Sequence, residues 1–314
     1  MSTPLVSIVL PTRNGGELLE KTLAAIARQR TDFPYEIVAV DSGSTDGTLQ
    51  RLERAAQQVV RIPPSSFNHG LTRNLGVEHA RGALVVLMVQ DAVPASAGWL
   101  ATLVAPLLAD PQVAGSFCRQ QAQPAATVLA KRYLDYWVAA SATPRTVRLG
   151  GQADLDRLDP HARLELCAFD NVCSCIRRSV WEHIRFRDTP IGEDIEWARS
   201  VLLAGHRLMY VPDAVVLHSH DRSAGYEFAR TYTLHRRLHE LVGLRTSPTM
   251  PLLARAIAGS VRLHLQCERE AARDGGGRAG VARALALAVA WPLGQYLGAL
   301  SAAKRWKPLR FDTV

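Results

Sequence analysis

The 314 residues carry a net charge of +8 and are 47% hydrophobic, which is enough apolar material for a substantial buried core. The surplus of positive charge is confined to the end of the chain, because residues 222–314 hold 15 Lys and Arg against 6 Asp and Glu. No zinc-finger spacing, aromatic RNA-binding strand or Gly-rich RNA loop accompanies these cations, so nucleic acid is not expected as a partner.

The cysteines indicate the compartment. There are five, an odd number, and Cys173 and Cys175 lie too close together for a C-x-x-C redox or zinc motif. We therefore expect reduced thiols in a cytoplasmic protein. The chain runs from Met1 into the strand-like VSIVLP almost at once, so no secretion signal is expected.

Apolar runs alternate with helix-period stretches over the first 120 residues. Strands are predicted over 5–11, 35–41, 59–62 and 84–90, and helices are predicted from about Glu17, after Asp46, after Asn68 and after Ser96. Strand and helix in alternation predict an open, mostly parallel α/β sheet with right-handed crossovers. Ligands of such sheets bind at the carboxyl ends of the strands.

The pattern is less regular from residue 120 to 165, where one helix is predicted over 125–141. Beyond it we predict a strand over 171–177, a helix over 191–205, a strand pair over 207–212 and 214–220, and helices from about Ala224 onward, interrupted at 274–280. We expect one α/β domain over residues 1–240 and a basic, mainly helical extension over 241–314.

Small polar residues follow the first two strands, as PTRNG at 11–15 and DSGSTDGT at 41–48. Exposed N–H groups and side-chain acceptors suit a ligand there, and Asp41 can accept from the N–H edge of a pyrimidine base. The alternative is a pair of ordinary turns, with Asp46 as a helix N-cap. No G-x-G-x-x-G and no Walker lysine follow the first strand, which argues against a dehydrogenase and a P-loop protein.

The segment FNHGLTRNLG, residues 67–76, predicts a helix capped by Asn68. His69, Arg73 and Asn74 fall on its first turns, where an arginine and a helix N-terminus both suit a diphosphate. An ordinary capped surface helix is the alternative, and the density of polar residues in one turn favours the ligand.

Two strands end in residues that suit a divalent ion. The apolar run of VLMVQDAVP, residues 86–94, stops at Gln90 and Asp91. HSH closes a later strand, where positions two apart share a face, so His218 and His220 can join Asp91 around a cation. The alternatives are a helix cap for Asp91 and a solvated strand end for the histidines.

Two adjacent acids, Glu193 and Asp194, open a predicted helix in the sequence GED. The helix dipole favours acids at a first turn, which is the structural alternative. The functional interpretation is that one carboxylate projects into the cleft and acts as a general base on an acceptor hydroxyl.

Four segments in order, from VSIVLPTRNGG through VDSGSTDGT and HGLTRNLG to GEDIEWARSVLLAGHRLMYVPDAVVLHSH, resemble a family-2 glycosyltransferase with the GT-A fold. The resemblance covers about residues 5 to 240 and implies that the domain over 1–240 is a nucleotide-sugar-binding and catalytic domain. QDA with FNHG is similar to the rhamnosyltransferase branch of cell-surface polysaccharide assembly. It implies inverting transfer of rhamnose or a similar hexose from a nucleotide diphosphate donor, dTDP-rhamnose being favoured, to a hydroxyl of a glycan or lipid-linked acceptor. The alternative is a catalytically inactive nucleotide-binding or membrane-surface adaptor.

The resemblance also implies roles for individual residues. Asp194 matches the general base, with Glu193 as its neighbour. Asp91 matches the last acid of a D-x-D element, and Gln90 and Ala92 depart from the family pattern. His218, with His220 beside it, matches a ligand position for Mg²⁺ or Mn²⁺. The implied nucleotide-binding residues are Pro11, Thr12, Arg13, Asn14, Asp41, Ser42, Gly43, Asn68, Arg73, Asn74 and Gln90.

Twenty residues without a charge, from Ala284 to Ala303, are long enough to span a bilayer. Pro292 and Gln295 fall mid-segment and argue for an interfacial or packed helix instead. The apolar face of such a helix would be Leu285, Val289, Leu293 (or Trp291), Tyr296 and Leu300, and its basic flanks Arg278, Arg283, Lys304, Arg305, Lys307 and Arg310. Packing on the protein's own core or on a second subunit is the alternative, and the resemblance favours peripheral contact with the inner face of the cell membrane.

Overall fold

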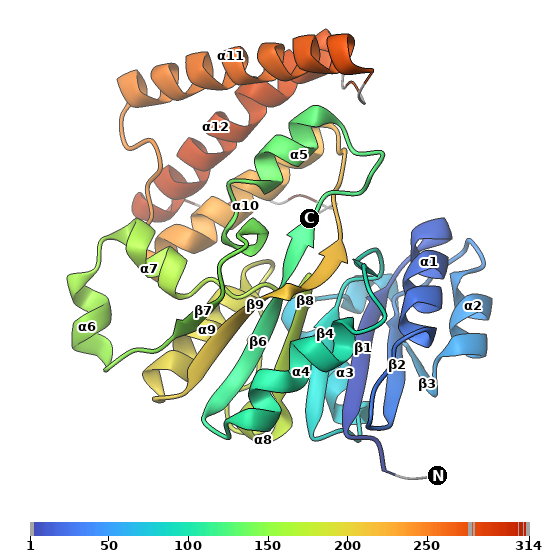
Figure 1. Cartoon of the computed structure of the whole chain (residues 1–314). Helices are drawn as coiled ribbons and strands as arrows, with labels where there is room; N and C mark the ends of the chain where they lie inside the picture. Colours follow the sequence, from blue (N-terminus) through green and yellow to red (C-terminus); the bar gives the residue numbers. More distant parts are fainter. Residues whose placement is uncertain (1–2, 276–277, 279, 307, 310, 312–314) are drawn as a thin grey trace.

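The computed structural model describes residues 3–275, 278, 280–306, 308–309 and 311 (Figure 1). The strands are β1 (Val6–Thr12), β2 (Tyr35–Asp41), β3 (Gln58–Arg61), β4 (Leu84–Met88), β5 (Val93–Pro94), β6 (Val113–Gln121), β7 (Arg145–Val147), β8 (Cys173–Arg177) and β9 (Arg207–Leu217). The α-helices are α1 (Gly16–Ala27), α2 (Thr48–Ala55), α3 (His69–His79), α4 (Trp99–Ala109), α5 (Val128–Leu134), α6 (Gln152–Arg157), α7 (Pro160–Leu166), α8 (Arg178–Trp181), α9 (Glu193–Leu203), α10 (Ala224–Val242), α11 (Met250–Asp274) and α12 (Val281–Ala303). Two short 3₁₀ turns are η1 (Pro64–Ser66) and η2 (Val138–Ala140).

In the described part of the chain, nine strands form one sheet in the order β3-β2-β1-β4-β8-β6-β9-β5, with β7 also paired to β9. β3, β2, β1 and β4 pair in parallel, β8 runs antiparallel between β4 and β6, and β6 is again parallel to β9. The carboxyl ends of β1, β2, β4, β6 and β9 therefore meet at one edge of the sheet, together with the segment that enters β8. The predicted α/β class with flanking helices and a helical C-terminal part is confirmed.

Helices cover both faces of the sheet, which explains why the central strands β1, β2 and β4 are buried along almost their whole length. Val6, Ile8 and Leu10 of β1 point toward a core shared with α1, α2 and α4. Val9 points the other way, into a core shared with α3, α8 and α9. The sheet thus holds its carboxyl edge between two rigid layers.

The C-terminal helices form a layer beyond the sheet, in which α12 packs on α10 and α11 lies along α12 and α5 (Figure 1). A Cβ atom at Gly298 would lie 2.3 Å from the carbonyl oxygen of Tyr232, so the close approach of α12 to α10 requires glycine there. The predicted domain boundary after residue 240 falls inside α10 and stays a prediction.

α12 is long and apolar enough to span a membrane by length and composition, and 44% of its most apolar window is buried inside the protein. Of its predicted interfacial face, Leu285 and Val289 are exposed, whereas Trp291 packs on Tyr133 and donates to Glu227. Leu293, Tyr296 and Leu300 are half-buried. The predicted basic flank at Lys307 and Arg310 lies outside the described residues.

Three details differ from the sequence prediction. The strand pair after residue 207 is one strand, β9, because the Pro212–Asp213 stretch forms an irregularity where the pairing with β6 shifts from Val211 to Val215. The helix predicted over 125–141 is only α5, Val128–Leu134, followed by a separate 3₁₀ turn. β6 was not predicted, and it delivers Gln120 to the carboxyl edge of the sheet.

Candidate active site

The loops after β1 and β2 are bonded to each other. Asp41 accepts the N–H groups of Gly43 and Ser44 at 3.1 and 3.0 Å and the hydroxyl of Thr12 at 3.3 Å. Asn14 accepts the N–H of Thr45 at 2.8 Å. The two loops therefore form one rigid rim, in which one carboxylate oxygen of Asp41 is already shared between two backbone donors.

Other loop residues maintain the shape of this rim. Ser42 donates to the carbonyl oxygen of Thr12 at 3.0 Å. Gly43 has φ +81°, and a Cβ atom there would lie 2.7 Å from Pro64, so only glycine fits. Asp46 accepts the N–H of Thr48 at the start of α2, which is the capping bond that the turn interpretation expects, although Gly47 occupies the cap position. Pro11 is half-buried at the end of β1.

Gln90 connects this rim to the end of β4. Its side-chain oxygen accepts the N–H of Arg13 at 2.9 Å, and its side-chain nitrogen donates to the carbonyl oxygen of Arg13 at 3.0 Å. A carboxylate at this position could accept the first bond but would repel the carbonyl. The amide of Gln90 therefore satisfies both backbone groups of Arg13, while the Arg13 side chain remains exposed.

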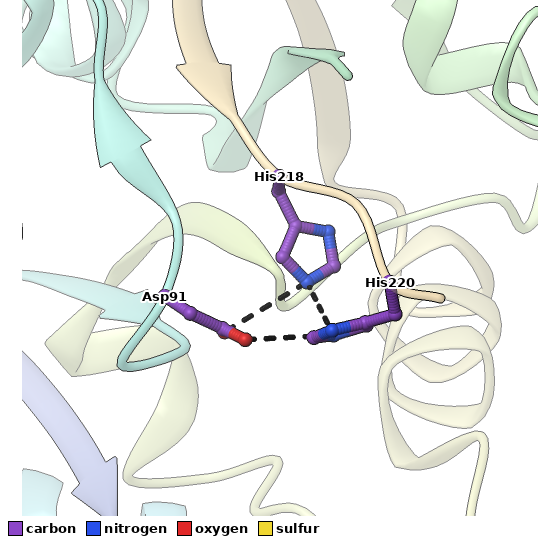
Figure 2. Close-up of side chains that lie close together, drawn as sticks. All are labelled: Asp91, His218 and His220. Carbon is purple, nitrogen blue, oxygen red and sulfur yellow. Dashed lines mark hydrogen bonds and ion pairs between the residues drawn. The ribbon is translucent and has the colours of Figure 1, made fainter. Parts of the chain in front are cut away.

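Asp91, His218 and His220 lie together, with one candidate ligand atom from each within 4.8 Å of the others (Figure 2). The Nε2 atom of His218 lies 3.8 Å from Asp91 Oδ1, and the Nε2 atom of His220 lies 3.5 Å from Asp91 Oδ2. The two Nε2 atoms are 3.0 Å apart. Because β4 and β9 end at the same edge of the sheet, residues 127 positions apart in sequence meet there.

Both histidines are neutral at neutral pH. Burial lowers the pKa of His218 to about 4, although Asp91 acts in the opposite direction. Burial also lowers the pKa of His220, again against the effect of Asp91. Neutral imidazole is the form that binds metal ions, so the protonation state suits a cation site.

Arg73 and Glu193 form a buried ion pair between α3 and α9. Their Nη1 and Oε1 atoms are 3.0 Å apart, and the side chains are only 5% and 6% exposed. Burial acts against ionisation of Glu193, but Arg73 and then His69 lower its pKa below the ordinary value. Arg73 also donates to the carbonyl oxygen of His69 at 2.9 Å. Its guanidinium is therefore engaged by the protein, and we leave it out of the diphosphate site expected from the sequence.

Two further residues of α3 are also engaged by the protein. Asn74 donates to the carbonyl oxygen of Phe186 at 2.8 Å and accepts from Trp181 and from the N–H of Phe186. Asn68 caps α3, as predicted, by accepting the N–H groups of Gly70 and Leu71. Both amides therefore have partners within the protein, and the nucleotide contacts that the resemblance implied for them stay a prediction.

The pKa of Asp194 is shifted in the opposite direction from that of Glu193. Its carboxylate accepts the N–H groups of Ile195 at 2.8 Å and Asn171 at 3.3 Å. Burial, and then the charges of Glu193 and Asp170, raise its pKa well above the ordinary value. A carboxyl group of this kind is a stronger base than an exposed aspartate once it is ionised.

Three polar residues that the sequence analysis missed, Gln120, Asp170 and Asn171, lie between these groups. Gln120 accepts from His218 Nδ1 at 3.0 Å and donates to Asp170 at 2.6 Å. Trp137 donates to the same oxygen of Asp170 at 2.7 Å. Asn171, the next residue, donates its N–H to Asp194. The segment entering β8 thus connects the histidine end of the site to the Asp194 end.

No local pattern marks these three residues. Gln120 lies in a strand that was not predicted, and the Asp170–Asn171 pair precedes a short apolar strand without a recognisable motif. β8 runs antiparallel to β4 and β6, so the residues that precede it lie beside the carboxyl ends of those strands. The Asp170–Asn171 pair can be recognised as part of the site only when this strand direction is known.

The glycosyl transferase family 2 model matches residues 7–166. The chain belongs to glycosyl transferase family 2. It is 29% identical over 231 residues to the O-antigen chain rhamnosyltransferase RfbN of Salmonella typhimurium, covering 72% of this chain and 70% of the relative. It is 27% identical over 232 residues to the O-antigen chain rhamnosyltransferase WbaN of Salmonella anatum, covering 73% and 70%.

Solved structures agree on the GT-A fold. The mannosyltransferase PcManGT from Pyrobaculum calidifontis, in complex with GDP-Man and Mn²⁺, superimposes with a TM-score of 0.60 and 21% identity, covering 98% of this chain and 89% of that one. Glucosyl-3-phosphoglycerate synthase from Mycobacterium tuberculosis superimposes with a TM-score of 0.54 and 19% identity, covering 77% and 81%. As a family-2 member, the protein is a glycosyltransferase whose reacting groups should lie at the carboxyl edge of the sheet.

Proposed function

We propose that this glycosyltransferase moves rhamnose from dTDP-rhamnose to a hydroxyl group of a glycan or lipid-linked acceptor, with inversion at the anomeric carbon. The observation that carries the proposal is the presence of Asp194, a half-buried carboxyl with a raised pKa, together with the cluster of Asp91 and the two histidines, along one edge of the sheet. The names of the two Salmonella relatives support rhamnose and cell-surface polysaccharide.

The donor nucleotide is proposed to lie on the rim formed by the loops after β1 and β2. Residues 11–14 and 41–43 supply this rim, and Gln90 fixes its position relative to Asp91. One oxygen of Asp41 accepts from two backbone N–H groups and the other from the hydroxyl groups of Thr12 and Ser44, which fixes the carboxylate at this rim, where we propose that it also accepts the N–H of a pyrimidine base.

Asp194 is proposed as the general base. Its carboxylate takes the proton of the acceptor hydroxyl while the hydroxyl oxygen forms a bond to the anomeric carbon and the bond from that carbon to the diphosphate oxygen breaks. The electron pair of the broken bond leaves with the nucleoside diphosphate. One displacement from the face opposite the leaving group gives inversion.

Asp91 and His218 are proposed to hold a divalent cation, with His220 adjacent. Ligands about 2.1 Å from one octahedral ion lie about 3 Å apart at right angles, close to the spacing of these side chains. Imidazole nitrogen beside carboxylate oxygen suits Mn²⁺ better than Mg²⁺, which prefers oxygen ligands. A bound cation would stabilise the negative charge of the departing diphosphate.

The acceptor and its location complete the proposal. We infer that the protein is cytoplasmic and contacts the inner face of the membrane through α12, where Val281, Leu285 and Val289 form an exposed apolar stripe at helical spacing. This orientation would bring the enzyme to lipid-linked glycans. The comparisons give no support to the alternative of an inactive adaptor.

The test is turnover on a panel of nucleotide sugars with Mn²⁺ present, measured as released nucleoside diphosphate in the presence of an O-antigen acceptor. We expect dTDP-rhamnose to be used at least about tenfold better in kcat/KM than UDP-glucose, UDP-GlcNAc and GDP-mannose, since the loss of one or two hydrogen bonds between the protein and the donor sugar costs this much. NMR of the product should show an inverted anomeric centre. Equal use of all donors would remove the rhamnose assignment, and retention would remove the single displacement.

A further inference from the structure

The polar groups beyond the two histidines form a continuous chain. Arg222 contacts His220 Nδ1 at 3.4 Å, His220 Nε2 contacts His218 Nε2 at 3.0 Å, and His218 Nδ1 contacts Gln120 at 3.0 Å. Gln120 then donates to Asp170 at 2.6 Å. Each of these four contacts requires one donor and one acceptor.

The two ends of the chain fix its direction. A guanidinium can only donate, so Arg222 makes His220 Nδ1 the acceptor and leaves the proton of His220 on Nε2. At the other end Asp170 accepts from Gln120, Trp137 and the N–H of Val172, an arrangement suited to a carboxylate.

Gln120 carries this direction into the histidine pair. Because its nitrogen faces Asp170, its oxygen faces His218, which places the His218 proton on Nδ1. His218 Nε2 is then unprotonated, and its lone pair accepts the N–H of His220 Nε2. The argument from Arg222 and the argument from Asp170 therefore place the protons of His218 and His220 on the same nitrogen atoms.

The two histidines are therefore not equivalent. His218 Nε2 carries the lone pair that a cation ligand needs, and in the metal-free protein this lone pair accepts the N–H of His220, whereas His220 Nε2 carries a proton and lies 3.5 Å from Asp91 Oδ2 (Figure 2). Sequence spacing alone could not distinguish these two side chains.

We propose that Gln120 and Asp170 are positioning residues that hold His218 in the Nδ1-protonated tautomer, so that His218 is the cation ligand and His220 is a hydrogen-bond donor beside it. This inference deepens the proposed function and rests on its cation site. Neither residue touches the substrate in this role, since both act through His218.

The experiment uses two variants of the full-length protein and one matched control. Gln120→Met keeps the size of the side chain and removes the acceptor for His218. Asp170→Asn keeps the shape but lets the Gln120 amide turn over, so that its nitrogen faces His218. Gln58→Met is the control, because Gln58 contacts Nδ1 of His79 at 2.7 Å on an exposed surface away from the site.

The first readout is the ¹⁵N spectrum of the imidazoles in metal-free protein, with the His218 signals identified by their loss in His218→Gln. We expect wild type and Gln58→Met to show a protonated Nδ1 and an unprotonated Nε2 for His218, and both site variants to show a mixture or the opposite tautomer. A wild-type proton on Nε2, or an unchanged pattern in both folded site variants, would overturn the proposal. Thermal melts confirm folding, and the more conservative Asp170→Asn supplies the result if Gln120→Met is unstable.

The second readout is Mn²⁺ affinity by calorimetry without donor. Both site variants should bind Mn²⁺ about 10- to 100-fold more weakly than wild type, the usual effect of removing a partner of a ligating histidine. Affinities within twofold of wild type would contradict the positioning role. Wild-type protein that binds no Mn²⁺ but shows the expected tautomers would instead refute the cation site of the proposed function and leave the hydrogen-bond chain in place.

Discussion

This protein has two clusters of ionisable side chains, Arg73 with Glu193 and Asp91 with His218 and His220, that differ in spacing and in exposure. Arg73 and Glu193 lie 3.0 Å apart with side chains 5% and 6% exposed. Asp91 lies 3.5 and 3.8 Å from His220 and His218, beyond ordinary hydrogen-bond length, with side chains 13–33% exposed. The first group pairs its two charges within the protein and connects α3 to α9, whereas in the second the Asp91 carboxylate and the Nε2 atom of His218, both possible cation ligands, lie near each other without an ion pair of that kind.

The largest expected effect is on stability, from Glu193→Gln. The amide keeps the shape of the side chain but leaves the Arg73 guanidinium buried without a charged partner, which costs about 3–5 kcal/mol in the free energy of unfolding. Urea titration measures this loss. Glu53→Gln, which breaks the exposed pair with Arg61, is the control and should cost less than about 1 kcal/mol. Equal losses in the two variants would return Arg73 to the list of diphosphate ligands.

Asp194→Asn should show the opposite behaviour. Burial and neighbouring acids disfavour ionised Asp194, so a neutral isostere should leave stability nearly unchanged. Turnover should fall at least about 100-fold, because the acceptor proton loses its base. Single-turnover transfer and donor binding, measured together, check this. Transfer within a few-fold of wild type would assign proton removal to another group.

Asp91→Ala, compared with EDTA treatment of the wild type, tests whether Asp91 and the two histidines bind a cation. In wild type, EDTA should weaken dTDP binding about tenfold, a usual size for two coupled ligands, and Mn²⁺ should restore it. Asp91→Ala should bind dTDP at the EDTA-treated level whether or not Mn²⁺ is added. Asp213→Ala, an exposed aspartate of β9, serves as the control and should behave as wild type. Wild-type affinity that is independent of metal would leave Asp91 without a cation.

The pH dependence of kcat should distinguish Asp194 from an ordinary aspartate. Its pKa is raised, so the active carboxylate form is lost on acidification at a higher pH than usual, and kcat should fall about tenfold per pH unit below that pKa. Asp170→Asn removes one of the charges that raise the pKa and should move the acid limb to lower pH. Profiles at saturating donor and Mn²⁺ measure this, and an acid limb that moves upward would contradict the assignment.

The sequence was sufficient for the fold class and for where polar residues gather, because strand–helix alternation places Asp41, Asp91 and His218 at one edge. It was not sufficient to show that Arg73 and Glu193 pair within the protein whereas Asp91 lies beside the two histidines. Whether Arg73 is free or paired depends on Glu193, 120 residues later, and Asn74 is engaged by Trp181 through tertiary packing alone. Gln120 was not predicted as a site residue because β6 was not predicted. Its contact with Asp170 depends on β8, which runs antiparallel beside β6.

The smallest expected effect concerns the exposed apolar stripe of α12. Leu285 is 37% exposed and lies on the same face as Val281 and Val289, whereas the opposite face packs on α10. Deleting α12 would uncover α10 and confuse membrane binding with unfolding, so a point substitution is the better test. Leu285→Glu should weaken co-sedimentation with anionic vesicles about fivefold, the equivalent of roughly 1 kcal/mol for an apolar side chain that loses its contact with the acyl region. Leu108→Glu, at a 52% exposed leucine of α4, should bind vesicles as wild type does. Equal binding by wild type and Leu285→Glu would mean that the stripe does not enter the bilayer, and a weakening shared by Leu108→Glu would reduce the effect to added negative charge.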